Sequence, residues 1–331
     1  MDTLSIIIPT VRYSEYIDLA IESCFKVKHK KEIIVNINNT SVKEYEQSRY
    51  WLNNEVNWSG GDYTDILPMN QSINSAITKS SGEWLFLLSD DDMIGDGFLS
   101  GRELSEMSKD HLYMTHLEVI DEDGKAKRGG ELVSQRDEMT GREALELFYQ
   151  TKIHNHLSLF TFSRSLLLKV GSFEILGYPN GYYMDTVMHG KLLANSSKVF
   201  IEHSPVFFRR ESRFQGSAKF YFDSVNDYFD EIVNSLMSDE RFYSATIEKY
   251  GSRYNFKKKM LRDRFKSEWS KLNNSTYNTA LKPKFILFYK HLIYWDTGFD
   301  FKMISFLYVL LFRYKSLIPK KFKQKIKSFL G

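Results

Sequence analysis

The sequence predicts an α/β protein with a doubly wound, mostly parallel sheet and a helical, basic C-terminal extension. Over the first 110 residues, short apolar runs rich in β-branched residues alternate with stretches at helical spacing. The apolar runs are nearly continuous, as in parallel strands buried on both faces. Strand–helix–strand order implies right-handed crossovers, and such sheets bind ligands beyond the carboxyl ends of their strands.

Six elements are expected in this first part, and they alternate along the chain. The strands are residues 4–8, 32–37 and 84–88, and the helices are residues 14–25, 42–52 and 68–80.

The chain then predicts an antiparallel excursion over residues 111–135, with an apolar run at 111–120 and a turn at Asp121-Glu122-Asp123-Gly124. Helices are expected at 140–150 and 184–195, a strand at 198–209, and only helices from about 219 onward. We therefore expect a catalytic domain at 1–218 and a helical region at 219–331.

Composition narrows the class of protein. Hydrophobic residues make up 42% and charged residues 26%, as in ordinary folded proteins. The single Cys24 excludes an internal disulfide framework or a multi-cysteine zinc site, so a reducing compartment is expected. The N-terminus lacks the basic start and long apolar stretch of a signal peptide.

The net charge of +3 conceals two opposite segments. Residues 251–331 carry 19 Lys and Arg against 4 Asp and Glu, a balance of +15, and residues 1–250 carry −12. Such asymmetry predicts that the basic end meets an anionic surface. Because the acidic body would repel nucleic acid, we expect an anionic membrane surface and no nucleic-acid partner.

Three adjacent carboxylates, Asp90, Asp91 and Asp92, follow the apolar run at 84–88. Like charges at the end of a buried strand repel one another unless a cation neutralises them. A calcium loop fails on spacing, because Gly101 stands where its twelfth-position Glu is needed. The pattern favours Mg²⁺ or Mn²⁺ shared with phosphate oxygens. A helix N-cap remains the alternative, although Asp96 is nearer the next helical stretch.

Three segments together resemble a known family: "SIIIPTVRYSEYIDLAIES", "EIIVNINNTS" and "NQSINSAITKSSGEWLFLLSDDDMI". In pattern and order they resemble glycosyltransferase family 2, of the bacterial surface-polysaccharide type. The resemblance covers about residues 3–210. It implies the A-type glycosyltransferase fold, a Rossmann-like sheet, with a nucleotide-sugar donor and inversion at the anomeric carbon.

The resemblance also assigns residues on the donor side. Pro9 and Thr10 match the first-strand end that touches the base, and Asp90 matches the aspartate near the ribose. Asp91 and Asp92 match those at the metal and the diphosphate. Asn74 matches an asparagine on the helix before the aspartate strand and completes the implied nucleotide-sugar site, with a role in fixing the backbone alone as the alternative.

One position departs from the family pattern. The family usually carries an aspartate after the second strand that accepts the N–H of uracil or thymine. Here the run is Asn36-Ile37-Asn38-Asn39-Thr40. An amide oxygen can still accept that hydrogen bond, without charge assistance, and Asn38 is the expected contact.

An inverting transfer needs a general base on the acceptor hydroxyl. In "GYPNGYYMDTVMHGKLL", Asp185 matches the second member of the family's acidic pair, whose first member is replaced by Met184. A cap for the helix at 186–194 is the alternative. Tyr182 and Tyr183 are placed to stack on a sugar face, or to pack within the loop.

Basic residues follow the strand at 198–209. Arg209, Arg210 and Arg213 are candidates for binding the diphosphate through forked hydrogen bonds, with solvated charges as the alternative. Three histidines match no zinc pattern and are expected to be packing or loop residues; they are His154, His156 and His203.

The C-terminal segment predicts membrane association. The apolar run at 303–312 is too short to cross a bilayer, which needs about 20 residues. The following segment places Phe322, Ile326 and Phe329 on one helical face with lysines elsewhere, as in helices that lie on anionic leaflets. An amphipathic helix packed on the catalytic domain is the alternative.

Together these features predict a cytoplasmic glycosyltransferase, peripheral on the inner face of the cell membrane. It would transfer one sugar to a lipid-linked or cell-surface glycan of the O-antigen or capsule (lipopolysaccharide) type. A sugar-1-phosphate nucleotidyltransferase is the enzymatic alternative, but "PTVRYSEY" lacks the Gly-rich loop such enzymes need. A degenerate protein that binds nucleotide-sugar without turnover is the other alternative.

Overall fold

A computed structural model describes residues 2–129, 136–150, 152–153, 156–174, 183–211, 222–260 and 263. The chain divides into two compact units. One comprises Met1–Ala218 and Glu231–Ala245, and the other Lys219–Asp230 and Thr246–Gly331. The expected membrane-binding segment at 303–331 lies outside the described residues.

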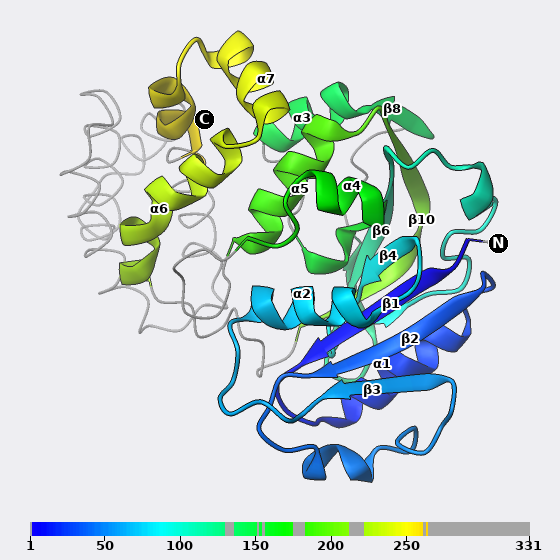
Figure 1. Cartoon of the computed structure of the whole chain (residues 1–331). Coiled ribbons are helices and arrows are strands. Elements are labelled where there is room, and N and C mark those ends of the chain that lie inside the picture. The colour runs from blue at the N-terminus through cyan, green and yellow to red at the C-terminus, as the bar shows by residue number, and fades with distance from the viewer. Residues whose placement is uncertain are drawn as a thin grey trace, which may run out of the picture. The chain divides into compact units, whose positions relative to one another are not determined.

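Within the described part of the first unit, ten strands form one mixed sheet (Figure 1). Its N-terminal half is parallel, in the order β3-β2-β1-β4. These strands are β1 (Leu4–Thr10), β2 (Lys31–Ile37), β3 (Val56–Gly60) and β4 (Trp84–Leu87). The three strands predicted from apolar runs are confirmed, and β3 was not predicted.

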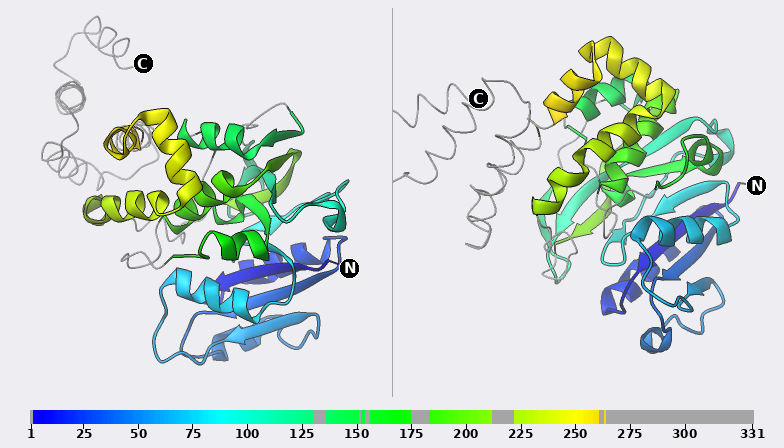
Figure 2. Two further views of the ribbon diagram at one scale, coloured as in Figure 1. Left: turned by 45° about the horizontal axis from the view of Figure 1, so that its top comes forward. Right: turned by 60° about the vertical axis from the view of Figure 1, so that its left-hand side comes forward.

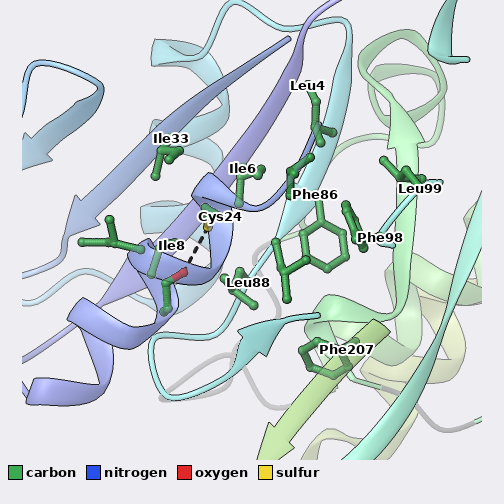
Figure 3. Close-up of a cluster of buried hydrophobic side chains, with 14 of the residues drawn as sticks. Leu4, Ile6, Ile8, Cys24, Ile33, Phe86, Leu88, Phe98, Leu99 and Phe207 are labelled. Atoms are coloured by element: carbon green, nitrogen blue, oxygen red, sulfur yellow. Dashed lines mark hydrogen bonds between the residues drawn. The ribbon is translucent and has the colours of Figure 1, made fainter. Parts of the chain in front are cut away.

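Helices cover both faces of this parallel half, as expected for a doubly wound sheet. Helix α1 (Glu15–Phe25) places Cys24 among Ile6, Ile8, Phe86 and Leu88, whose side chains share one face (Figure 3). Because side chains alternate along a strand, the intervening residues face the other way, where helix α2 (Met69–Lys79) contacts β1 and β2 (Figures 1 and 2). Both predicted helices are confirmed.

The other half of the sheet is mixed. Strand β9 (Phe160–Ser163) runs antiparallel to both β4 and β6 (His111–Ile120), so β6 is parallel to β4. Strand β10 (Lys198–Arg210) is parallel to β6, and β5 (Met93–Ile94) is antiparallel to β10. The carboxyl ends of β1, β2, β4, β6 and β10 therefore lie at one edge of the sheet.

The excursion predicted after residue 111 is confirmed. Strand β6 turns at Asp121 to Lys125 and returns as β7 (Ala126–Gly129), antiparallel to β6. A further short strand, β8 (Glu138–Thr140), pairs antiparallel with β10. The turn matters for the site, because it lies at the carboxyl end of β6.

The helices expected at 140–150 and 184–195 are also confirmed. Helix α3 (Gly141–Tyr149) begins with a capping box between Thr140 and Glu143. The remaining helical elements include α5 (Met184–Asn195), α4 (Arg164–Lys169), α6 (Phe222–Met237), α7 (Glu240–Tyr250), η2 (Leu104–Glu106) and η3 (Leu157–Leu159). Beyond residue 219 the described elements are helices, as predicted, and none of the described helices has the length and apolarity of a bilayer-spanning segment.

The helix predicted at 42–52 is wrong. Only a short 3₁₀ helix, η1 (Lys43–Gln47), forms there, followed by turns. The Trp51 and Trp58 rings lie 5.1 Å apart and the Tyr45 ring packs at 6.2 Å from Trp58. Packing of these aromatic rings between the turns and β3 outweighs the local helical spacing.

Candidate functional site

The three aspartates lie in the turn that connects β4 to β5, at the edge where the strand carboxyl ends gather. The Asp92 N–H donates to the Ser89 carbonyl at 3.1 Å and closes this turn. The Asp92 residue is buried, with 1% of its surface exposed, whereas Asp90 and Asp91 are partly exposed. The turn therefore presents two carboxylates outward and holds the third inside.

Burial and mutual repulsion make these carboxylates unusually basic. Burial, and next the charge of Asp91, raise the pKa of Asp90 to about 7. The same two causes, in the same order, raise the pKa of Asp92 well above its usual range. Burial also raises the pKa of Asp91. Each ionised carboxylate would gain from a nearby positive charge.

Arg210, at the end of β10, ties the aspartate turn to the turn after β6. Its backbone N–H donates to Oδ1 of Asp92 at 2.8 Å, and its Nε donates to the Asp91 carbonyl at 3.0 Å. Its Nη1 donates to the carbonyls of Asp121 and Glu122 at 3.0 and 2.7 Å. Arg210 is 1% exposed. The guanidinium that we expected at a diphosphate is thus engaged by the protein's own carbonyl groups.

Arg209 differs from its neighbour. Its side chain is 29% exposed and donates through Nη2 to Glu211 at 3.0 Å. Its Nε is buried and has no hydrogen-bond partner among the described residues. Its charge also lowers the pKa values of Asp91 and Asp92, so it lies near the carboxylates. Arg209 is therefore partly exposed and close to the carboxylates, whereas Arg210 is enclosed by backbone carbonyls. Arg213 lies outside the described residues.

The ends of β1 and β2 meet beside Asp90. The Thr10 hydroxyl donates to the Arg12 carbonyl at 3.0 Å and lies close enough to Asp90 to lower the pKa of that carboxyl. The Thr10 carbonyl accepts the Asn38 N–H at 2.7 Å. Pro9 lies one residue earlier in β1, opposite Asn36 of β2. The structure thus brings the predicted base-side residues together with the first aspartate.

The Asn38 side chain has a structural partner. Its Nδ2 donates to the Leu67 carbonyl and its Oδ1 accepts the Leu67 N–H, both at 2.8 Å. This two-bond pairing fixes the segment between β3 and α2 against the end of β2. The amide that was expected to read the base therefore holds that segment in place.

Asn74 makes the same kind of pairing from α2. Its Nδ2 donates to the Phe173 carbonyl at 2.7 Å, and its Oδ1 accepts the Phe173 N–H at 3.1 Å. One turn earlier, Asn70 donates to the Glu174 carbonyl at 2.5 Å. Both asparagines therefore hold backbone, which for Asn74 is the alternative to a direct contact with the donor.

Asp185 lies in the first turn of α5. The helix begins at Met184, preceded by Tyr183 in a left-handed conformation (φ 66°), so Asp185 is its second residue rather than its cap. Its Oδ1 accepts the Thr186 N–H at 2.7 Å. Burial raises its pKa above the ordinary range. Tyr182 lies outside the described residues.

Two histidines, the buried His189 and the partly exposed His156, lie between α5 and the aspartates. His189 lies one turn beyond Asp185, on the same side of α5. It is close enough to His156 to lower the pKa of that ring, after burial and Arg209. Nε2 of His156 lies 3.4 Å from Oδ2 of Asp92. The sequence pattern does not predict this contact, because the two residues are 64 positions apart. Of the other two histidines, His154 lies outside the described residues, and His203 pairs with Asp137 at 3.0 Å.

The site fits a divalent cation in one respect. Oδ2 of Asp92 is buried without a hydrogen-bond partner among the described residues, beside the partly exposed Asp91. No group of three or more potential metal-ligating side chains occurs in the described part of the chain. Any bound Mg²⁺ or Mn²⁺ would therefore depend on few protein ligands, as is usual where phosphates supply the others.

The fold has known structural relatives. No family model matches the sequence, and no curated protein matches it. Among solved structures, S. aureus TarS 1–349 aligns with a TM-score of 0.58 and 14% identity, over 88% of this chain and 80% of that chain. The same TarS piece in complex with UDP-GlcNAc gives 0.57 and 14%, over 88% and 79%.

The longer TarS structure aligns at 12% identity over 88% of this chain and 49% of that one, so this chain spans about half its length. TarS is a glycosyltransferase. The chain described here has the same glycosyltransferase fold, with its central, mostly parallel sheet covered by helices. At identities this low, the likeness extends to the fold alone.

Proposed function

We propose that this protein is an inverting, nucleotide-sugar-dependent glycosyltransferase. The observation that carries the proposal is the convergence of Thr10, the aspartate turn and Arg209 at the carboxyl edge of a glycosyltransferase fold. Ligands of doubly wound sheets bind at this edge. Solved TarS structures of the same fold hold UDP-GlcNAc and UDP.

On the donor side, Pro9 and Thr10 would lie against the base and Asp90 against the ribose. Asp91 and Asp92 would hold Mn²⁺ or Mg²⁺, and a bound cation would neutralise charge on the departing diphosphate. Arg209 would donate forked hydrogen bonds to the same phosphates. Arg210, Asn38 and Asn74 would hold the surrounding backbone in place.

On the acceptor side, Asp185 would act as the general base. An acceptor hydroxyl attacks the anomeric carbon in line with the leaving diphosphate, and its proton passes to the Asp185 carboxylate. The bond from the anomeric carbon to the diphosphate oxygen breaks, which inverts the configuration. A pKa raised by burial makes Asp185 a better proton acceptor than an exposed aspartate would be.

The acceptor and the location are proposed from sequence. We propose a lipid-linked or cell-surface glycan of the O-antigen or capsule type as acceptor, with the enzyme peripheral on the inner face of the cell membrane. The charge balance of +15 over residues 251–331 supports attraction to an anionic surface.

Hydrolysis of a nucleotide-sugar panel tests the proposal. UDP-, GDP- and dTDP-sugars are incubated with Mn²⁺ and the wild type, Asp91→Asn or Asp92→Asn protein. We expect slow hydrolysis of at least one donor by the wild type and a loss of at least tenfold in both variants. Asp96→Asn is the matched control, because that carboxylate is exposed on the neighbouring turn and pairs with Lys26 at 3.7 Å.

Two results would contradict the proposal. Binding of a nucleotide-sugar without any turnover, with or without added glycan, would favour the degenerate binding protein instead. If both aspartate variants hydrolyse the donor at the wild-type rate, the aspartate turn does not take part in the reaction.

A further inference from the structure

His156 is the one imidazole that the described structure places against the aspartate turn. It precedes η3, and its Nε2 lies 3.4 Å from Oδ2 of Asp92. Its ring packs on Phe207 of β10, with the centroids 5.2 Å apart. Oδ2 of Asp92 is buried and accepts no hydrogen bond from a described residue, so the imidazole of His156 faces an otherwise unsatisfied carboxylate oxygen.

The proton on this ring can be located from its other contact. Nδ1 of His156 lies 3.3 Å from the Ser158 N–H, which can only donate. Nδ1 is therefore the acceptor nitrogen, and a neutral ring carries its proton on Nε2, the atom that faces Asp92. The contact at Ser158 thus selects the tautomer that offers an N–H to the carboxylate.

The segment that carries His156 is hydrogen-bonded to the site. Ser158 is fully buried, and its hydroxyl accepts the Ser89 N–H at 3.3 Å, immediately before the aspartates. The Thr115 hydroxyl of β6 donates to the carbonyls of Ser158 and Leu159, both at 3.0 Å. The segment that carries the imidazole is therefore fastened both to β6 and to the start of the aspartate turn.

We propose that His156 is a positioning residue that orients Asp92 for binding of a divalent cation and a nucleoside diphosphate. The Arg210 N–H holds Oδ1 at 2.8 Å, and the imidazole faces Oδ2, so the carboxylate is set from both sides. Partners that orient a ligating carboxylate commonly change metal affinity by about 10–100-fold when removed. The inference rests on the proposed function, and it adds a residue that neither the sequence pattern nor the resemblance assigned.

Two substitutions separate the two contacts of the ring. In His156→Asn, the side-chain oxygen can still accept the Ser158 N–H, since Asn is a good cap, but the side chain is too short to reach Asp92. In His156→Gln, the longer amide can offer an N–H at about the place of Nε2. We measure the affinity for Mn²⁺ with UDP, GDP or dTDP by calorimetry, and the Tm of each protein.

We expect His156→Asn to weaken Mn²⁺-dependent nucleotide binding by about 10–100-fold and His156→Gln to remain within about threefold of wild type. His111→Asn is the matched control. Nδ1 of His111 also accepts a backbone N–H, from Ser108 at 3.2 Å, and its ring packs edge-on against Phe200 at 5.4 Å. His111 begins β6, at the end of the strand away from the aspartates, so the control should bind as wild type does.

Two outcomes would overturn the inference, and a third would overturn the proposed function on which it rests. Wild-type affinity in His156→Asn would show that Asp92 needs no partner at Oδ2. Equal losses of Mn²⁺-dependent nucleotide affinity in folded His156→Asn and His156→Gln proteins would show that only the packing of the ring matters. If His156→Asn fails to fold, a folded His156→Gln protein with a large loss of affinity would show the same. If the wild type binds none of the three nucleotides with Mn²⁺, the proposed function itself falls, which is a distinct result.

Discussion

The backbone N–H of Arg210 donates to Oδ1 of Asp92 at 2.8 Å, across 118 residues of sequence. The same arginine donates through its side chain to carbonyls in the aspartate turn and in the turn after β6. One residue thus joins the carboxyl ends of three strands, β4, β6 and β10. The geometry of the aspartates therefore depends on β10 as much as on the strand that precedes them.

We predict that Arg210→Lys lowers the free energy of unfolding by about 3 kcal/mol or more, because a lysine cannot reproduce the guanidinium fork and leaves buried carbonyls unpaired. Urea denaturation measures the loss. Arg209→Lys is the control, since that side chain is partly exposed, and should cost about 1 kcal/mol or less while weakening affinity for nucleoside diphosphate. Equal stability losses would contradict the distinction between the two arginines.

Sequence pattern predicted the parallel core because the relevant signals are local. The runs that became β1, β2 and β4 are mostly apolar, and all three strands are completely or largely buried. Strand β3, with the sequence VNWSG, lacks that signal because only Val56 is buried. Its position is set by pairing with β2 and by the packed aromatic rings beside it.

The site was only partly predictable for a related reason. Proximity of Thr10 to Asp90 follows from adjacent parallel strands, which a sequence pattern can indicate. The partners of Asn38 and Arg210 are backbone groups in irregular turns, and no residue type marks them. His156 contacts Asp92 only because β9 is inserted antiparallel between β4 and β6, a topology that spacing does not encode.

Asp185 gives a prediction about the reaction rate. Asp185→Asn preserves the size of the side chain and an oxygen for the Thr186 N–H, but the amide cannot take a proton. We expect turnover to fall by about 10²–10⁴-fold with donor affinity within about threefold of wild type. Steady-state kinetics with a glycan acceptor, together with nucleotide binding by calorimetry, separate the two effects.

The pH profile checks the same assignment. A base works when ionised, so kcat/KM should rise with pH as Asp185 loses its proton. Because burial raises this pKa, the acid limb should lie above the value of about 3.9 for a free aspartate. If the acid side of the kcat/KM profile titrates at the value of a free aspartate, or if Asp185→Asn turns over within threefold of wild type, Asp185 is not the general base.

Asn74 gives a prediction about stability rather than binding. Asn74→Ala removes both hydrogen bonds to the Phe173 backbone, and each unpaired buried group costs about 1–3 kcal/mol. We expect the free energy of unfolding to fall by about 2 kcal/mol, with donor affinity unchanged at temperatures where the protein is folded. Thr78→Ala, an exposed position one turn further along α2, should change stability by less than about 0.5 kcal/mol. If Asn74→Ala loses donor affinity without losing stability, Asn74 contacts the nucleotide-sugar directly.

The last prediction concerns the C-terminal segment, and it rests on sequence alone. Residues 303–331 combine an apolar run with an end in which five lysines accompany three large apolar residues; these are Lys320, Lys321, Lys323, Lys325, Lys327, Phe322, Ile326 and Phe329. Each lysine near an anionic leaflet contributes about 1 kcal/mol, and salt weakens the attraction. Full-length protein should therefore sediment with vesicles rich in phosphatidylserine at low salt, and less so at high salt.

A protein ended after Tyr314 tests the segment, because it keeps the apolar run at 303–312 and removes all five lysines. It should retain the wild-type Tm and slow donor hydrolysis while losing sedimentation with anionic vesicles. Replacing the five lysines by glutamine in the full-length chain is the matched control, since it keeps the apolar residues and removes only the charge. If the shortened protein unfolds, the segment packs on the rest of the protein. If the glutamine variant sediments as the wild type does, the lysines do not attach it to the membrane.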